Sequence, residues 1–326
     1  MKKILNRTIV LASVILLSLN ACNQKSSSKS EEQDTPISIV RLGSFFTAVD
    51  YAPYLIAKNK GWFEDALKES GTKIEYTTFQ SLPTLNEALA TNKIDIIFEA
   101  EPPAIVGRAA GIDEKIVDIS CSINLGILVP QDSKIASVRD LKGKSIALLA
   151  GTGVHYGVLK ALEQNGLDKS DVKIVDMSPP DAKNAFETGK VDAWAIWSPF
   201  IDQEELTKRG RLLPNSAFQI QSIMVARNQF ILKSPSVYLT VRKVFDKSQA
   251  WMEQNSIEAQ SIVAKELGLS KDEVQKAWPR HNWKAQITPE IIQDIQNKAN
   301  FLFEEKFIDK KVDVEKDLVQ PSSQHK

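Results

Sequence analysis

Residues 139–200 constrain the fold of this chain most, because they hold two successive strand–helix units joined by short turns. Ser145–Leu149 is short and apolar, which is typical of a strand buried in a parallel sheet. Gly151-Thr152-Gly153 follows it, and apolar residues then recur at helical spacing, so the glycines open a helix whose first N–H groups can meet an anion. The second unit comprises a strand at 172–175, a helix at 179–188 and the Trp-rich strand end 191–199. Two such units predict a parallel sheet with ligand space at its strand ends.

The rest of the chain predicts a mixed α/β fold. Glu101 precedes Pro102, which favours an extended conformation for Glu101 before the next helix begins. With 326 residues, the chain is long enough for two lobes, each with its own core. The pattern predicts further strands at 37–43, 73–78, 94–98, 116–119, 126–129 and 220–226, and helices at 52–60, 84–90, 104–110, 237–254, 256–267, 271–277 and 289–306.

The first 21 residues have the pattern of an export signal. Lys2, Lys3 and Arg7 precede an apolar run from Thr8 to Leu19 that is too short to span a bilayer. The sequence Leu19-Asn20-Ala21-Cys22 resembles a lipobox, so we expect cleavage before Cys22 and acylation of its side chain, which anchors the protein to the membrane. The alternative is an ordinary signal in which the cysteine is incidental. Residues 22–36 are polar and predict a flexible linker.

Composition excludes several classes of function. The 41 basic residues balance the 41 acidic ones, so the chain has no broad basic field for nucleic acid. The 3 histidines form no metal-ligand cluster with cysteine, and no Gly-x-Ser-x-Gly motif occurs. We therefore expect no metal, no cofactor and no catalytic residue. With Cys22 acylated, Cys121 has no disulfide partner and is expected to be a small buried side chain.

Four motifs in this order and spacing resemble one family, the aliphatic-sulfonate, nitrate and taurine binding proteins of ABC importers. The likeness extends upstream to Arg41-Leu-Gly43 and fades after about Arg227, and the sulfonate-binding branch is nearest. The run Trp197-Ser198-Pro199 departs from it, because Ser198 stands where the sulfonate binders often carry an acid. The four motifs are Asp140-Leu-Lys-Gly-Lys144, Gly151 to Tyr156, Pro179-Pro-Asp-Ala182 and Val191 to Trp197.

The resemblance implies a two-lobed α/β fold of the type II periplasmic-binding-protein kind, with a cleft between the lobes. It implies a monomeric, extracytoplasmic, lipid-anchored protein that binds a small organosulfonate and delivers it to a permease with its ATPase. The hinge is expected near 121–129 and 215–223. The expected segments are a signal peptide at 1–21, the linker at 22–36, lobe 1 at 37–125 and 220–310, lobe 2 at 126–219, and a polar tail at 311–326, of which the last dozen residues are expected to be frayed.

The glycine turn supplies the main candidates for ligand binding. The hydroxyl of Thr152 and the N–H groups of Gly153, Val154 and His155 are suited to capping an oxyanion, although Thr152 also fits an ordinary helix N-cap. In the His155-Tyr156 pair we expect His155 at the cleft and Tyr156 in the packing.

Aromatic side chains are expected to wall the cleft. Trp194 and Trp197 lie three positions apart at a strand end, so one can join the core while the other faces the ligand. Phe45 or Phe46 and Tyr51 or Tyr54 are further candidates for aromatic walls.

Glu99 and Glu101 indicate a second kind of ligand. On an extended segment these two side chains point the same way, and two carboxylates would select a cationic or zwitterionic solute instead of an anion. The alternative is that one of them is solvated or paired with Arg108. A third hypothesis is an enzyme, since the same fold includes a family that synthesises the thiamine pyrimidine.

Overall fold

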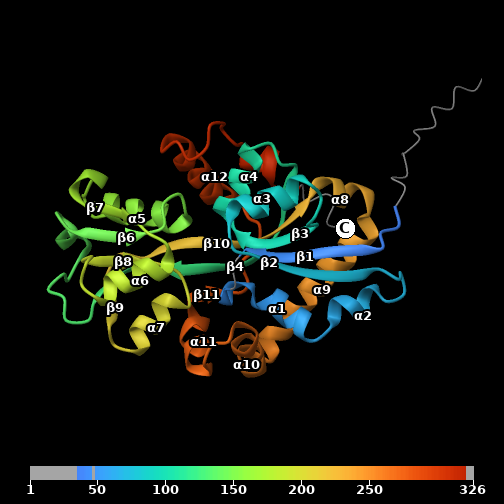
Figure 1. Cartoon of the computed structure of the whole chain (residues 1–326), viewed down its shortest axis with the longest axis horizontal. Coiled ribbons are helices and arrows are strands. Elements are labelled where there is room, and N and C mark those ends of the chain that lie inside the picture. Colours follow the sequence, from blue (N-terminus) through green and yellow to red (C-terminus); the bar gives the residue numbers. More distant parts are fainter. Residues whose placement is uncertain (1–34, 46–47, 321–326) are drawn as a thin grey trace, which may run out of the picture. The chain divides into compact units, whose positions relative to one another are not determined.

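Two mixed β-sheets with helices on their faces form the part of the chain that the computed structural model describes, residues 35–45 and 48–320. The signal, the lipobox with Cys22, Phe46 and the final six residues lie outside this range. Within it, no helix is long and apolar enough to cross a membrane. The predicted α/β class is confirmed (Figure 1).

The first sheet has six strands in the order β11-β4-β10-β3-β1-β2. β1 pairs in parallel with both β2 and β3, whereas β10 runs antiparallel between β3 and β4. The strands are β1 (Ile39–Phe45), β2 (Lys73–Phe79), β3 (Ile96–Ala100), β4 (Glu114–Leu125), β10 (Phe218–Arg227) and β11 (His281–Asn282).

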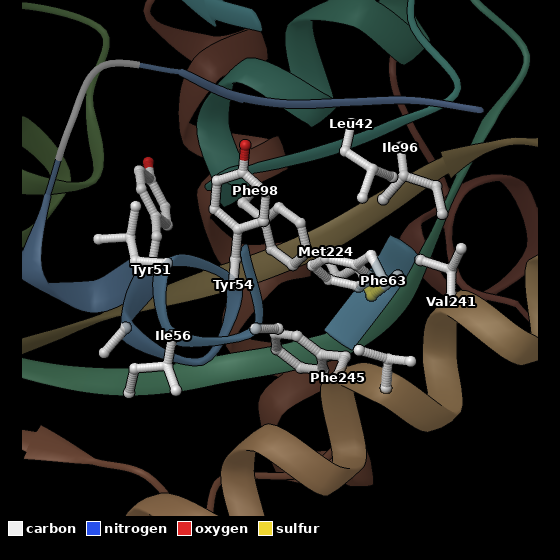
Figure 2. Packing of buried hydrophobic residues seen from close by; sticks show 14 of the residues in the cluster. Leu42, Tyr51, Tyr54, Ile56, Phe63, Ile96, Phe98, Met224, Val241 and Phe245 are labelled. Atoms are coloured by element: carbon white, nitrogen blue, oxygen red, sulfur yellow. The ribbon is translucent and has the colours of Figure 1, made fainter. Parts of the chain in front are cut away.

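Helices cover both faces of this sheet, as Figure 1 shows. One face packs against η1 (Val49–Tyr51), α1 (Ala52–Asn59), α2 (Trp62–Leu67), α8 (Asn228–Lys233), α9 (Pro235–Gln254), α10 (Ser256–Leu267), α11 (Lys271–Ala277) and η4 (Trp278–Arg280). The other packs against α3 (Leu82–Ala90), α4 (Glu101–Ala109), α12 (Pro289–Glu304) and η5 (Val314–Leu318). In Figure 2, Phe98 of β3 lies between Tyr54 and Phe245, with ring centroids 4.5 and 5.3 Å away. Stacked aromatic rings thus join α1 and α9 to the sheet.

The second sheet contains the two strand–helix units, and its order is β7-β6-β8-β5-β9. β6 pairs in parallel with β7 and with β8, as predicted, whereas β5 is antiparallel to both its neighbours. α5 covers one face, while α6 and α7 cover the other. The elements are β5 (Ile127–Pro130), η2 (Val138–Leu141), β6 (Ser145–Leu148), α5 (Gly153–Gln164), η3 (Lys169–Asp171), β7 (Lys173–Asp176), α6 (Pro179–Glu187), β8 (Ala193–Ala195), α7 (Phe200–Leu206) and β9 (Gly210–Leu212).

Two segments connect the sheets, one at Gly126 between β4 and β5 and one at 213–217 between β9 and β10. Ser216 links them, because its hydroxyl accepts from Ile127 N at 3.0 Å and donates to Leu213 O at 2.7 Å. A Cβ on Gly126 would lie 2.9 Å from that hydroxyl, so the close approach requires glycine. Each sheet with its helices forms one lobe of the expected fold, and the chain passes between the lobes at these two segments.

Two local predictions are corrected. Glu101 is the first residue of α4 and not part of an extended segment, because proline is tolerated in the first helical turn, where the N–H has no acceptor. The C-terminal residues up to Gln320 are packed and not frayed. Val314 and Leu318 are fully buried in the core beside α12, and Gln320 N donates to Ile116 O at 3.0 Å. In the sequence, the apolar residues of this segment are interspersed with charged ones, so the pattern did not indicate that the segment is buried.

Candidate functional site

A cavity of about 310 Å³ lies at the carboxyl ends of strands from both sheets. Its volume is suited to a small molecule, and its walls are mostly apolar. From the first sheet and its helices it is lined by Phe45, Ala48, Asp50, Tyr51, Ser81, Leu82, Ala100, Pro102, Pro103, Val106 and Ile220. From the second sheet it is lined by residues 149–154 and Trp197. This is where open α/β sheets bind ligands, since the loops after parallel strands gather there.

Helix N-termini dominate the wall. α5 contributes residues around its N-cap, Thr152, α4 contributes Pro102 and Pro103, and α3 contributes Ser81 and Leu82. η1, which leads into α1, lines the cavity with its Asp50 and Tyr51. Aligned peptide dipoles place partial positive charge at each helix N-terminus. These helix ends therefore contribute partial positive charge to the wall, which favours an anion, although Pro102 and Pro103 of α4 carry no N–H group to donate.

Thr152 is the N-cap of α5. Its hydroxyl donates to Leu149 O at 2.7 Å and accepts from His155 N at 3.3 Å. The hydroxyl proton and the His155 N–H are thus both used inside the turn. The N–H groups of Gly153 and Val154, in the first helical turn, have no intrahelical acceptor and remain the candidates for contact with an anion.

Aromatic rings form the other wall. Phe45, Tyr51 and Trp197 all line the cavity, and the Tyr51 hydroxyl already donates a hydrogen bond to Phe45 O at 3.0 Å. Trp194, expected as a second candidate, instead lies fully buried between Phe186 and Phe200. Because alternate residues of β8 face opposite sides of the sheet, Trp194 points into the core under α6 and α7.

The His155-Tyr156 pair lies away from the cavity. The His155 ring packs edge-on against Phe301 and Phe307, at centroid distances of 5.2 and 5.9 Å, and its Nδ1 accepts from Gly151 N. Burial lowers the pKa of His155. His155 therefore stabilises the glycine turn from the side opposite the cavity, contrary to the expectation that it faces the cleft. Tyr156 packs on Phe301, as expected.

Glu99 and Glu101 are both fully buried, and neither lines the cavity. Glu101 forms an ion pair with the buried Lys298 of α12 and accepts from Gln221 N at 3.1 Å. Glu99 lies on β3, where burial and the charge of Glu114 raise its pKa well above the ordinary value. The expectation that these carboxylates face the solute is corrected, since α4 begins at Glu101 and the two side chains have separate environments.

Asp50 is a cavity residue that no sequence motif indicated. It lines the cavity with 6% of its surface exposed, and burial, with a smaller contribution from Glu101, raises its pKa to about 7. Its backbone oxygen accepts from Ser120 Oγ at 2.6 Å, and Cys121 lies buried beside it, as predicted for that cysteine. Its place just before a predicted helix was the only available signal.

A family model described as "NMT1/THI5 like" matches residues 48–259, which include the second sheet, four of the six strands of the first sheet and every residue that lines the cavity except Phe45. The chain belongs to the NMT1/THI5-like family. One relative, from Bacillus subtilis, is named a putative aliphatic sulfonates-binding protein; it is 36% identical over 95% of this chain and 93% of its own length. The family recognised from the sequence motifs is thus confirmed.

Solved structures agree on the fold. The crystal structure of the periplasmic aliphatic sulphonate binding protein SsuA from Escherichia coli has a TM-score of 0.78 and 26% identity, and covers 89% of this chain and 99% of its own. The expected periplasmic-binding-protein fold is therefore confirmed. The desulfurization enzyme DSZB, at 17% identity, covers 88% of this chain and 98% of its own with a TM-score of 0.63, which shows the fold alone.

Proposed function

We propose that this chain is the extracytoplasmic solute-binding protein of an ABC importer, and that its solute is an aliphatic sulfonate or a similar organic oxyanion. The observation that carries the proposal is the N-terminus of α5, which opens with Gly153 and Val154 into an apolar cavity. Backbone N–H groups bind the oxyanion there, and Phe45, Tyr51 and Trp197 contact the aliphatic part. The names of the relative and of the structural neighbour support this solute class.

A cationic or zwitterionic solute has less support. The carboxylates that suggested it do not line the cavity, and Glu101 is neutralised by Lys298. The helix N-termini that do line it favour negative charge.

The lobes close over the solute by a hinge at Gly126 and residues 213–217, and contacts made to both lobes stabilise the closed form. Acylation of Cys22 would hold the protein at the outer side of the cell membrane, where it meets a permease and its ATPase as a monomer. These parts of the proposal rest on the lipobox and on the family resemblance.

A thermal-shift panel tests the solute class. Linear alkanesulfonates are compared with alkylamines and amino acids of similar length on the same protein. A bound solute stabilises the folded state by RT ln(1 + [L]/Kd), about 4 kcal/mol at a thousandfold excess over Kd. We expect the sulfonates to shift the midpoint and the amines to leave it unchanged; the reverse pattern contradicts the proposal.

The same samples test the enzyme hypothesis. A binding protein releases its solute unaltered, so mass spectrometry after long incubation should recover the added alkanesulfonate intact. If the folded protein instead converts the alkanesulfonate progressively into a product, and the unfolded protein does not, the function is catalysis and not binding.

A further inference from the structure

Asp50 places a carboxyl group in a mostly apolar cavity for which an anionic solute is proposed, and the proposed function gives this group no role. Among the described lining residues, it alone carries a carboxyl, amine, imidazole or guanidine group. The hydroxyls of Tyr51 and Thr152 are held by Phe45 O and Leu149 O, and that of Ser81 lies 2.8 Å from the Thr84 hydroxyl. Asp50 is therefore the side chain best placed to meet a polar group of the solute.

An ionised Asp50 conflicts with an anionic solute. Both charges would lie within one small, mostly apolar cavity, where water screens their repulsion weakly. A sulfonate stays ionised throughout the physiological pH range, so it cannot relieve the repulsion by taking a proton. The carboxyl can do so, and it then becomes a hydrogen-bond donor.

The surroundings of Asp50 favour the neutral form. The titratable groups that act on it or its neighbour Tyr51 are Glu101 of α4, Glu99 of β3 and Cys121 of β4, all buried. The cation beside Glu101, Lys298, is already bound to Glu101 and Asp294. Burial, with a smaller contribution from Glu101, raises the pKa of Asp50 to about 7 before any solute is present, against the opposing effect of its own backbone N–H and of the Ser222 hydroxyl.

We propose that Asp50 binds the oxyanion of the solute as a neutral carboxylic acid, donating a hydrogen bond to one of its oxygens while the N-terminus of α5 contacts the others. The inference rests on the proposed function. No bond is made or broken apart from the O–H of Asp50, whose proton comes from solvent when the carboxyl is ionised. Sulfonate binding at alkaline pH is thus accompanied by the uptake of one proton.

Isothermal titration calorimetry with butanesulfonate tests the inference. With a pKa of about 7 for Asp50, the binding-competent fraction falls about thirtyfold between about pH 6 and about pH 8.5, and the apparent affinity of the wild type should fall equally. Asp50→Asn keeps the size of the side chain and an amide donor but does not titrate, so its affinity should change by less than about twofold over that range. Asp132 is exposed and does not line the cavity, so Asp132→Asn removes one negative charge at a distant site. This variant should show the same ratio of affinities at the two pH values as the wild type.

A second measurement needs no variant. At about pH 8.5, titrations in two buffers of different ionisation enthalpy count the protons bound with the solute, and we expect about one per butanesulfonate. Tight butanesulfonate binding with no proton uptake and no pH dependence overturns the role of Asp50 but keeps the proposed function. No binding at either pH overturns the proposed function itself. A preference for an aminoalkanesulfonate that grows with pH and is lost in Asp50→Asn would also overturn the inference, because Asp50 would then act as a carboxylate.

Discussion

At the scale of one residue, Gly153 lies where α5 of the second lobe packs closely against a strand of the first lobe. A Cβ at this position would lie 2.8 Å from Ile220 Cγ2, which belongs to the strand that returns to the first sheet. Gly153→Ala must therefore push the start of α5 away from β10, and overpacking of this kind costs about 1–3 kcal/mol. We expect the affinity for butanesulfonate to fall about tenfold or more, equivalent to about 1.4 kcal/mol.

Gly210→Ala is the control for that variant. It adds the same methyl group on β9, 3.2 Å from Glu204 Cβ and 3.3 Å from the ring of Phe186, and Gly210 does not line the cavity. Both variants should unfold at lower urea concentration than the wild type. Only Gly153→Ala should also bind butanesulfonate more weakly than the wild type under conditions where the protein is folded. Equal affinities for the two variants would show that the α5 N-terminus does not contact the solute.

At the scale of elements, α7 is joined to η4 by buried charge. Arg280 Nε donates to Asp202 Oδ1 at 2.8 Å, and Ser198 Oγ donates to Asp202 Oδ2 at 2.6 Å. Asp202 is fully buried, and burial raises its pKa while Ser198 and Arg280 lower it. Ser198 directly follows Trp197, which lines the cavity. These hydrogen bonds therefore connect the cavity wall at Trp197 to η4, which packs with the helices of the first sheet.

Arg280→Gln is expected to destabilise the protein strongly. It leaves the buried Asp202 without its cation, and removing one partner of a buried pair costs about 3–5 kcal/mol. Urea unfolding measures the loss, and the double variant with Asp202→Asn should lose less than the two single variants added together. Lys142→Gln breaks an exposed pair with Asp171 and should cost about 0–1 kcal/mol. Additive losses in the first cycle would mean that Arg280 and Asp202 do not act as a pair.

At the scale of the whole molecule, local features were predictable and distant partners were not. The strand, the glycine turn and the N-cap at Thr152 depend on residues a few positions apart, so the sequence alone located the α5 wall of the cavity. Glu101 was misjudged because Lys298, its partner, lies 197 positions away on α12. Asp50 was missed for the same reason: its burial depends on β4 and β10, which only the folded chain brings beside η1.

Buried carboxyls make the stability of the whole molecule depend on pH. Glu99 and Glu114 are fully buried, and none of their oxygens has a hydrogen-bond partner among the described residues. Burial raises the pKa of Glu114 to about 8 from an ordinary 4.5, so the folded chain holds this proton more tightly than the unfolded chain. The resulting stabilisation is complete below about pH 4.5 and is lost as the pH rises through about 8, at up to about 1.4 kcal/mol per pH unit.

Glu114→Gln tests this contribution, because an amide stays neutral at every pH and can donate to Glu99. We expect the wild type to be less stable at about pH 8.5 than at about pH 5.5, and the variant to lose less over the same range. Urea unfolding across the pH series gives both slopes, and the exposed Glu69→Gln should reproduce the wild-type slope. If Glu114→Gln and the wild type have the same slope, Glu114 ionises in the folded chain as it does in the unfolded one, and the pH dependence must come from the other buried carboxyls, Asp50 and Glu99 among them.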